Sequence, residues 1–402
     1  MKIKDIVRFH SETTMPIPDV VYHLYSLPSF DNNQTREELL GQDIQSNKFT
    51  VPNRCILFNK LNVRFKRIWR IDSDEDHKIA STEFLPLIID ENKVDFAYCF
   101  YLLASPAITD YLCGQNANTS GSHKRIDPTN FFNIGIKLPP LAQQYEIGKL
   151  LSSLDAKIKL NRQINQNLEA MAKQLYNYWF VQFDFPNEEG KPYKSSGGEM
   201  LWNDKLKRNI PVGWHCGNLF EIAVFTNGLA CQKFRPKDDE VPLPVIKIRE
   251  MHDGISVDTE EVTSNIPESV KVYNGDVLFS WSASLEVMLW AYGLGGLNQH
   301  IFKITSANDF PKSFYYFQLL DYVDVFKKMA EARKTTMGHI TQDHLQQSTI
   351  AIPDNKDIAE KFEELISPIF KQIVKLQEEI SNLIKQRDEL LPLLMNGQIT
   401  IE

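Results

Sequence analysis

The second half of this chain repeats the pattern of its first half at a distance of about 215 residues. The first copy reads FFNIGIKLPPLAQQYEIGKLLSSLDAKIKLNRQINQNLEAMAKQLYNYW, and the second reads LQQSTIAIPDNKDIAEKFEELISPIFKQIVKLQEEISNLIKQRDELLPLL. Each copy is a short apolar run typical of a β-strand, a proline turn, and a long stretch with coiled-coil spacing. Each copy also follows a region of mixed α/β character. The chain is therefore expected to alternate two globular domains with two long helices.

The heptad spacing is continuous in both copies, over residues 147–179 and 362–394. Either stretch alone could be an amphipathic helix on its own domain, but two matched seams predict that the helices pair with each other. Two polar seam residues, Asn161 and Asn165, weaken such a seam but fix its register and its partner. The predicted seam residues are Leu151, Leu154, Ile158, Asn161, Asn165, Leu168, Ile366, Ile369, Ile373, Leu376, Ile380 and Leu383.

The repeat extends into the globular regions. The segment GDVLFSWSASLEVMLWAY matches NRCILFNKLNVRFKRIW, HIFKITSANDFPKSFYYFQLL matches EFLPLIIDENKVDFAYCFYLL, and PLPVIKIREM occupies the place of YHLYSLPSF. We interpret YHLYSL, FLPLII and FFNIGIKLP as strands, VDFAYCFYLLAS as a helix, and FDFPNEEGKPYKSSGGEMLWNDKLKRNIPVGW as an ordered connection outside the core. The fold class is α/β, with two tandem pseudo-repeated domains and two long helices packed as an antiparallel coiled coil. The predicted boundaries are 1–142 for the first domain, 143–185 for the first helix, 186–213 for a linker, 214–354 for the second domain and 355–402 for the second helix.

Antiparallel pairing of the helices would place one domain at each end of a rod. A helix of about 33 residues is about 50 Å long. Half-sites on one face of B-DNA repeat about every 34 Å. Such a rod is long enough to hold two readers on DNA with unread base pairs between them.

The composition is that of an ordinary globular chain, with 43% hydrophobic and 24% charged residues among 402. The N-terminus MKIKDIVRFHSE has no apolar signal-peptide core, and the apolar stretch FAYCFYLLASPAITDYL is short for a bilayer and contains Pro106 and Asp110. The five cysteines are scattered, as in reduced thiols. We therefore expect a cytoplasmic protein without a membrane span.

The net charge of −8 argues weakly against nucleic-acid binding, but binding depends on local fields. Between Arg54 and Arg70 the chain carries six cations and no acid. Lys60, Arg64, Lys66 and Arg67 in this run could contact phosphates or guanine edges, or could be a solvated basic strand face. The matching segment SWSASLEV of the second domain is neutral to acidic, so the two domains would read DNA with different chemistry.

The polar loops before the last strand of each domain are stronger candidates, because both combine amide or hydroxyl groups with cations and a glycine in matching places. Such groups can pair with adenine, guanine or phosphate, although an ordinary polar loop has the same composition. The weaker candidates in the second domain are Lys233, Arg235 and Trp281. The loop candidates are Asn116, Asn118, Thr119, Ser120, His123, Lys124 and Arg125 in the first domain and Arg333, Lys334, Thr335, Thr336 and His339 in the second.

The whole chain resembles the DNA specificity subunit of type I restriction-modification systems. The resemblance rests on the order and spacing of LPPLAQQ, AKQLYNYWFVQF, GKPYKSSGG with IPVGW, MGHI before IAIP, and LLPLLMNGQI. It implies two target recognition domains that each read half of a split, asymmetric DNA sequence, with two antiparallel helices that set the unread spacer. The second helix differs from the first at its start, because it begins with IPDNKDIAEKF and lacks the LPPLAQQ form.

The resemblance also implies partners and places the cofactors on them. The chain would bind double-stranded DNA, recruit two methylation subunits that use S-adenosylmethionine, and recruit restriction subunits that use ATP and Mg. It would hold no cofactor or metal of its own. The aromatic group at the end of the first helix is either a packed junction or part of a docking surface for a methylation subunit. This group comprises Tyr176, Tyr178, Trp179, Phe180 and Phe183.

Two other classes of function remain open from the residues alone. The chain contains no phosphate-binding GxxxxGK[ST] loop, no [DNS]PP[FY] amine-methylation motif and no HExxH motif, and its nine histidines are not spaced as metal ligands. We therefore expect no catalytic residues, although an enzyme with an unrecognised site is a third reading. The main alternative to DNA recognition is a coiled-coil scaffold that joins two proteins and binds DNA weakly or not at all.

Overall fold

The computed structural model describes residues 1–402 apart from 33, 116–124, 283, 333–339, 341 and 402. The chain forms two compact units, unit 1 with residues 1–157 and 383–402 and unit 2 with residues 158–382. Two long helices, α5 (Leu141–Tyr176) and α10 (Asp357–Met395), contribute a segment to each unit. A π-helical turn, Asn177–Val181, continues α5.

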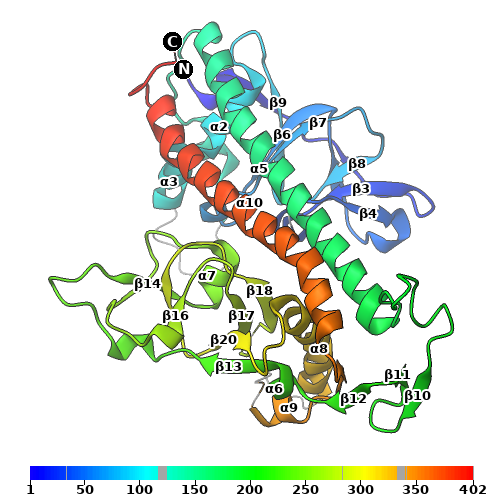
Figure 1. The fold of residues 1–402 in the computed structure, drawn as a ribbon. Helices are drawn as coiled ribbons and strands as arrows, with labels where there is room; N and C mark the ends of the chain where they lie inside the picture. Colours follow the sequence, from blue (N-terminus) through cyan, green and yellow to red (C-terminus); the bar gives the residue numbers. More distant parts are fainter. Residues whose placement is uncertain (33, 116–124, 283, 333–339, 341, 402) are drawn as a thin grey trace. The chain divides into compact units, whose positions relative to one another are not determined.

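Unit 1 contains two sheets among its described residues, both visible in Figure 1. The first is antiparallel and has the strand order β1 (Val7–Phe9), β9 (Phe84–Ile89), β6 (Arg54–Asn59) and β7 (Ile68–Asp72). The second has the order β2 (Thr13–Thr14), β5 (Lys48–Thr50), β8 (Lys78–Ala80), β3 (Val21–Tyr25) and β4 (Glu37–Leu40). In the second sheet β3 and β8 are parallel, and the other neighbours are antiparallel.

Strand β6 separates two apolar cores in unit 1. Side chains alternate between the two faces of a strand. Ile56 and Phe58 accordingly belong to the core beneath α2 (Phe96–Ala104), whereas Cys55 and Leu57 belong to a second core. This explains why the sequence of β6 is apolar at consecutive positions.

Helix α2 is the buried helix predicted from its apolar sequence. The carboxylate of Asp95 caps its first turn by accepting the Tyr98 N–H at 2.8 Å, and Gln144 of α5 accepts the Asp95 N–H at 2.9 Å. Tyr98, Cys99 and Leu103 are fully buried. The remaining helices of unit 1 are α1 (Leu27–Asp31), α3 (Pro106–Gln115) and α4 (Pro128–Phe132). Among the described residues, no helix combines the length and apolarity that crossing a bilayer requires.

Unit 2 repeats the sheet topology of unit 1. Its first sheet is antiparallel, with the order β13 (Ala223–Asn227), β20 (Ile301–Ser306), β17 (Val277–Ser280) and β18 (Glu286–Leu289). Its second has the order β15 (Glu261–Val262), β14 (Leu243–Ile246), β19 (Gly295–Leu297) and β16 (Lys271–Val272), with β14 and β19 parallel. The order β16-β19-β14-β15 matches β5-β8-β3-β4 in unit 1, pair for pair. The internal repeat of the globular regions is therefore confirmed.

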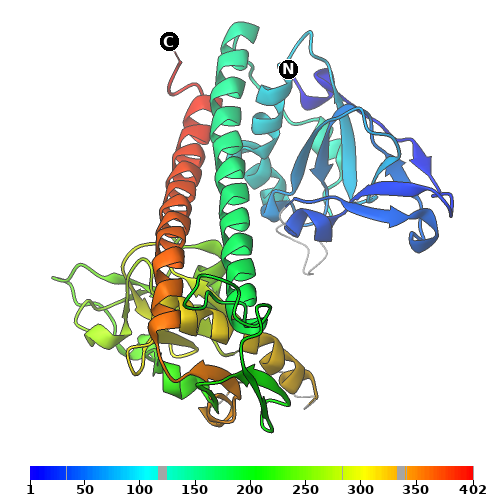
Figure 2. The ribbon, with the colours of Figure 1, turned by 45° about the vertical axis from the view of Figure 1, so that its right-hand side comes forward.

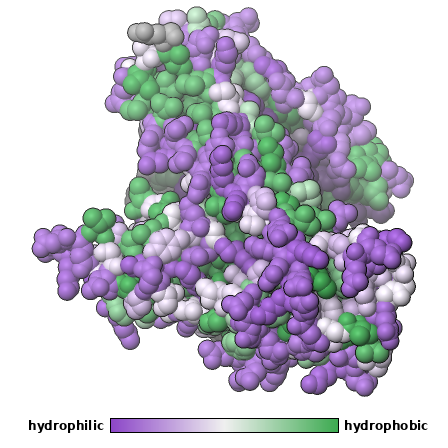
Figure 3. All heavy atoms as spheres, in the orientation of Figure 1, coloured by the Kyte–Doolittle hydropathy of each residue, from purple (hydrophilic) through white to green (hydrophobic). Residues whose placement is uncertain are grey.

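Unit 2 adds short elements around these sheets. Strands β10 (Met200–Asn203) and β11 (Arg208–Pro211) form a hairpin, and β12 (Trp214–Gly217) pairs with β21 (Ile350–Pro353). Its other helices are α6 (Leu219–Ile222), α7 (Ile248–Asp253), α8 (Lys312–Ala332) and α9 (Gln342–Gln346). On the face in Figure 3, apolar residues lie in separate areas with hydrophilic residues between them.

The two long helices pair antiparallel within each unit. In unit 1, Leu151 of α5 shares a core with Leu391 and Leu394 of α10. In unit 2, the Asn165 side-chain amide donates to the carbonyl of Ile373 at 3.3 Å. Further along α5, Asp155 contacts Arg387 in unit 1 and Tyr176 contacts Phe362 in unit 2, so residue numbers that rise along α5 fall along α10 in both units. Both ribbon views show the two helices side by side within each unit (Figures 1 and 2). The predicted antiparallel pairing is confirmed.

Two predictions about the connecting segments are wrong. Residues 131–139 are not a strand, because Phe131 and Phe132 end helix α4 and only Gly135 forms an isolated bridge, to Lys2. The segment after the first helix is ordered but is not outside the core. Phe183, Phe185 and Ile210 are buried in the main core of unit 2, since the β10–β11 hairpin folds back onto it.

The asparagines of the seam are buried with unmet hydrogen-bonding capacity. Asn161 is 5% exposed and Asn165 is 6% exposed. Among the described residues, the Nδ2 atom of Asn161 and the Oδ1 atom of Asn165 have no hydrogen-bond partner. A buried polar atom without a partner costs about 1–3 kcal/mol. Asn161 and Asn165 therefore lower the stability of the packing between α5 and α10.

Replacing both residues by leucine should stabilise unit 2. We expect the Asn161→Leu/Asn165→Leu variant to gain on the order of 1–2 kcal/mol, because unsatisfied polar atoms are exchanged for apolar contact. Denaturant unfolding followed by circular dichroism measures the shift. Ile373→Ala is the control, with an expected loss of about 2–4 kcal/mol. Earlier unfolding of the double variant would mean that the asparagines have partners.

A histidine joins the ends of the β12–β21 pair. The two ring nitrogens of His215 contact the Asp354 carboxylate at 2.5 Å and the Glu221 carboxylate at 3.2 Å. Burial alone lowers the pKa of His215, but the hydrogen bonds and charges of Asp354 and Glu221 outweigh it and raise the pKa above its usual value of 6.5. A histidine with a raised pKa binds its proton more tightly in the folded state.

This shift predicts a pH-dependent contribution to stability. It should be fully present below about pH 6.5 and should be lost as the pH rises through the higher pKa of the folded state. His215→Gln should flatten the dependence of the unfolding midpoint on pH in this window. His77→Asn, at an exposed histidine without a carboxylate partner among the described residues, is the control. Equal pH profiles for wild type and His215→Gln would contradict the prediction.

Candidate DNA interface

The turn between β6 and β7 is the most cationic candidate surface of unit 1. A 3-10 turn, Val63–Phe65, joins the strands, and Val63 anchors it in the core. Asn62 and Lys66 flank it in the left-handed conformation, with φ values of 51° and 45°. The buried Asn59 side chain holds both backbone groups of Leu61, at 2.8 Å to its N–H and 2.5 Å to its carbonyl. The turn is therefore held in one conformation by its own polar contacts.

The four predicted cations of this turn differ in what they contact. Arg67 makes two 2.7 Å hydrogen bonds to the Asp31 carboxylate, and its side chain is only 16% exposed. Lys60, Arg64 and Lys66 have no ion-pair partner among the residues that the structure describes. These three side chains remain available to phosphates, whereas Arg67 stabilises the turn through its ion pair with Asp31.

The basic run is partly neutralised from elsewhere in the chain. Arg54 binds the carboxylates of Asp72 and Glu91. Arg70 donates to the hydroxyl of Ser152 on α5 at 2.9 Å. The absence of acids within the run therefore overstates its free charge, and the free charge lies at the turn.

The structure brings the two candidate segments of unit 1 together. The N–H of Ile126 donates to the carbonyl of Lys60 at 2.9 Å, and Leu61 forms a bridge with Arg125. Helix α3, which ends at Gln115, packs against the Val63–Phe65 turn. Arg125 itself pairs with Glu83. Both flanks of segment 116–124 thus lie beside the β6–β7 turn. The other candidates in this segment lie outside the described residues: Asn116, Asn118, Thr119, Ser120, His123 and Lys124.

Unit 2 has the same arrangement with different side chains. Trp281 follows β17 as Lys60 follows β6, and its carbonyl accepts the N–H of Ile340 at 3.1 Å. The indole is partly buried, with its centroid 5.6 Å from the ring of His300 and 5.9 Å from that of Phe302. Trp281 of unit 2 therefore occupies the position that Lys60 occupies in unit 1. The candidates Arg333, Lys334, Thr335, Thr336 and His339 lie outside the described residues.

Lys233 and Arg235 are exposed in and just after a 3-10 turn, Cys231–Lys233. The three acids Asp238, Asp239 and Glu240 follow within a few residues, and Arg235 also lies near Glu260. Mixed charge makes this region a weaker DNA surface than the β6–β7 turn.

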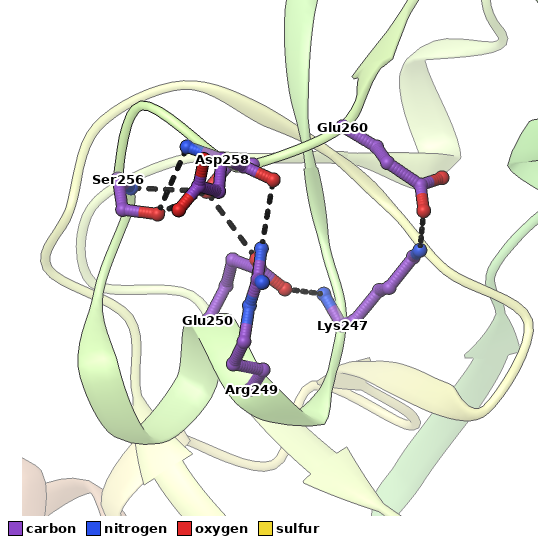
Figure 4. Close-up of polar contacts among 7 residues, drawn as sticks. Lys247, Arg249, Glu250, Ser256, Asp258 and Glu260 are labelled. Atoms are coloured by element: carbon purple, nitrogen blue, oxygen red, sulfur yellow. Dashed lines mark hydrogen bonds and ion pairs between the residues drawn. The ribbon is translucent and has the colours of Figure 1, made fainter. Parts of the chain in front are cut away.

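A polar network at α7 contains two cations that the sequence analysis missed (Figure 4). Glu250 is 1% exposed, and its carboxylate accepts from the Arg249 guanidinium at 2.6 and 2.9 Å and from the Lys247 N–H at 3.2 Å. Arg249 also donates to the carbonyl of Asp258 at 3.1 Å. Its pKa is raised by the hydrogen bond and charge of Glu250. The half-exposed Arg249 is thus a fixed cation on the surface of unit 2, beside Lys247.

Lys247 is itself paired with Glu260 at 2.5 Å, and this contact lowers the pKa of Glu260. The matching segment YHLYSLPSF of unit 1 has no cation, so the repeat offered no signal for either residue. The fixed geometry of Arg249 depends on the burial of Glu250, which only the structure reveals.

The aromatic group at the end of α5 is a packed junction. Tyr176, Trp179, Phe180 and Phe183 are at most 6% exposed, and they pack with Phe362 and Trp214 in the main core of unit 2. Their proposed role as a docking surface is wrong, because buried rings cannot meet a partner. Tyr178, at 38% exposed, is the exception.

The seam residues lie on the inner sides of the two helices. Leu151, Ile158, Asn161 and Asn165 of α5 are buried, and Leu154 and Leu168 are half-buried. On α10 the corresponding residues are Ile366, Ile369, Ile373, Leu376, Ile380 and Leu383, of which all but the half-buried Ile369 are buried. Among the described residues, no cluster of three or more His, Cys, Asp or Glu side chains could hold a metal ion.

The family model for the type I restriction modification DNA specificity domain matches residues 1–170 and 211–386. These two matches cover most of the chain, one in each half, and the chain therefore belongs to this family. The resemblance drawn from the sequence motifs is confirmed.

Individual relatives support the same assignment. The type I restriction enzyme MjaIX specificity subunit of Methanocaldococcus jannaschii is 24% identical, over 78% of this chain and 72% of the relative. The HindI specificity subunit of Haemophilus influenzae is also 24% identical, over 86% of each chain. A crystal structure of the type I restriction-modification S subunit from M. genitalium has a TM-score of 0.57 at 12% identity, covering 98% of this chain and 95% of that one. At that identity the structural likeness establishes the fold.

The different states of the turn cations predict different effects on DNA binding. Lys66→Ala should weaken binding to any duplex and should reduce the slope of log K against log salt by about 0.9, the value for one lost phosphate contact. Fluorescence anisotropy at several salt concentrations measures this. Lys93→Ala is the matched control, because Lys93 is also exposed but is paired with Asp90 at 2.8 Å. Equal slopes for Lys66→Ala and wild type would remove Lys66 from the interface.

Proposed function

We propose that this chain is the DNA-recognition subunit of a type I restriction-modification complex and reads a bipartite, asymmetric target with an unread spacer. Each unit would read one half of the target. The chain would perform no chemistry of its own. Its role would be to bind the target DNA and position it for the catalytic subunits.

The observation that carries the proposal is a repeated scaffold with unlike surfaces. Both units have the same strand order, and in both the residue after the central strand accepts a hydrogen bond from the residue that follows the polar loop. The accepting residue, which directly follows the central strand, is Lys60 in unit 1 and Trp281 in unit 2. Phosphate contacts position a protein on DNA, whereas side chains at base edges specify the sequence. Equivalent positions with different chemistry suit two different half-sequences.

The partners follow from the family. Methylation subunits would use S-adenosylmethionine to methylate adenine within the target, and restriction subunits would use ATP and Mg to translocate and cut the DNA. We propose two methylation subunits per chain, because the chain presents two similar halves. The complex would act in the cytoplasm, where its DNA substrate lies.

The decisive experiment is a methylome. The chain is co-expressed with its methylation subunit in a host without adenine methylation, and modified adenines are mapped over the genome. We expect a split motif with an undefined middle. The control is the methylation subunit expressed alone, which should not modify that motif.

Two outcomes would contradict the proposal. A contiguous motif without an unread middle would exclude two separate readers. An absence of modified adenines, from a complex shown to be assembled, would favour the scaffold that joins two proteins without reading DNA.

A further inference from the structure

An aromatic side chain lies exposed at the centre of the cationic turn of unit 1. Phe65 is 51% exposed, although it is a large apolar residue in a turn whose neighbour Val63 is buried. Between residues 60 and 67 the chain has four cations and no acid. An apolar protein surface would not suit a phenyl ring with cations beside it. Nucleic acid would suit it, because the phosphates attract the cations and the bases offer apolar surface to the ring.

The ring is held in place by its neighbours. The guanidinium of Arg64 lies 4.6 Å from the ring centroid, and that of Arg67 lies 4.8 Å from it. Both distances are within the range of cation–π attraction. Arg67 is itself fixed by two hydrogen bonds to Asp31. The position of Phe65 is therefore determined by a chain of contacts that ends at a carboxylate of helix α1.

The backbone of the turn presents the ring outward. The Phe65 N–H donates to the carbonyl of Asn62 at 3.1 Å, and the Lys66 N–H donates to that of Val63 at 3.0 Å. Asn62 and Lys66 both adopt positive φ, a conformation that costs non-glycine residues free energy. A shape fixed in advance lowers the entropy lost on binding.

We propose that Phe65 makes an apolar contact with the bases of the half-site read by unit 1, while Arg64 and Lys66 contact the flanking phosphates. This inference rests on the proposed function and adds to it the residue that distinguishes sequences. Phenylalanine contacts the thymine methyl group in the major groove or enters a base step as a wedge. In both cases the contact is with the bases, and it neutralises no phosphate.

The contact with bases has a measurable signature. With the complete chain assembled with its methylation subunit, Phe65→Ala should raise the Kd for a duplex containing the target on the order of tenfold. The Kd for a duplex without the target should change by less than about twofold, and the salt slope should stay at the wild-type value, because no phosphate contact is lost. Lys66→Ala should instead lower the affinity for both duplexes and reduce the salt slope.

Two further variants guard against misfolding and against a general effect of exposed apolar side chains. Phe65→Trp retains an aromatic ring and should bind the target within a few-fold of wild type. Ile17→Ala removes an apolar side chain that is 60% exposed elsewhere in unit 1 and should leave both affinities unchanged. Loss of target binding by Phe65→Ala with retention by Phe65→Trp would support the inference.

The inference and the proposed function fail in different ways. If wild type does not discriminate target from non-target duplex, the proposed function fails. If wild type discriminates and Phe65→Ala discriminates equally well, the inference fails while the proposed function stands. An equal loss of both affinities by Phe65→Ala, with a reduced salt slope, would also overturn the inference, since it would make the effect of Phe65 electrostatic.

Discussion

The packing of α10 against α5 is the contact on which both units depend. In unit 1 the core of residues 1–157 is completed by Leu391 and Leu394, which come from the last part of the chain. In unit 2 the core is completed by both helices, through Tyr176 of α5 and Phe362 of α10. Unit 1 is therefore not a continuous stretch of sequence, whereas unit 2 is the continuous stretch 158–382. Part of the apolar surface of each core is therefore removed from water by the packing of these helices.

A polar network within unit 1 connects α5 and α10 to helix α2 of the globular domain. Asp155 of α5 accepts hydrogen bonds from Arg387 of α10 at 2.9 Å and from the Tyr101 hydroxyl of α2 at 2.6 Å. Burial, with the negative charge of Asp155, raises the pKa of Tyr101, so the phenol remains a donor over the physiological range. Arg70 of β7 reaches the same part of α5 through Ser152. The strand that carries the cationic turn is thus tied to the helices at its far end, which limits how the turn can move relative to them.

The sequence predicted the architecture well because its strongest signals were repeated. Two matched seams predicted that the helices pair, and the alignment of the segments that contain β6 and β17 predicted a second domain that repeats the first. The errors arose where a local pattern has two physical explanations. FFNIGIKLP is apolar enough for a strand, but Asp127 caps a helical turn ahead of it by accepting the Thr129 N–H. The polar stretch after α5 has the composition of a linker, but its apolar residues Phe183, Phe185, Ile210 and Trp214 are buried in the core of unit 2.

The site was less predictable, since charge in a sequence does not report which charges are paired. Six cations between Arg54 and Arg70 appear equivalent in one dimension. In the fold, Arg54 and Arg67 pair with distant carboxylates, and Lys60, Arg64 and Lys66 have no ion-pair partner among the described residues. The same reasoning reconciles a net charge of −8 with DNA binding. Net charge is a sum over the whole chain, and a charge that is already paired exerts little field on a phosphate. At the β6–β7 turn, the field that acts on a phosphate arises from Lys60, Arg64 and Lys66, and Arg64 also lies against the ring of Phe65.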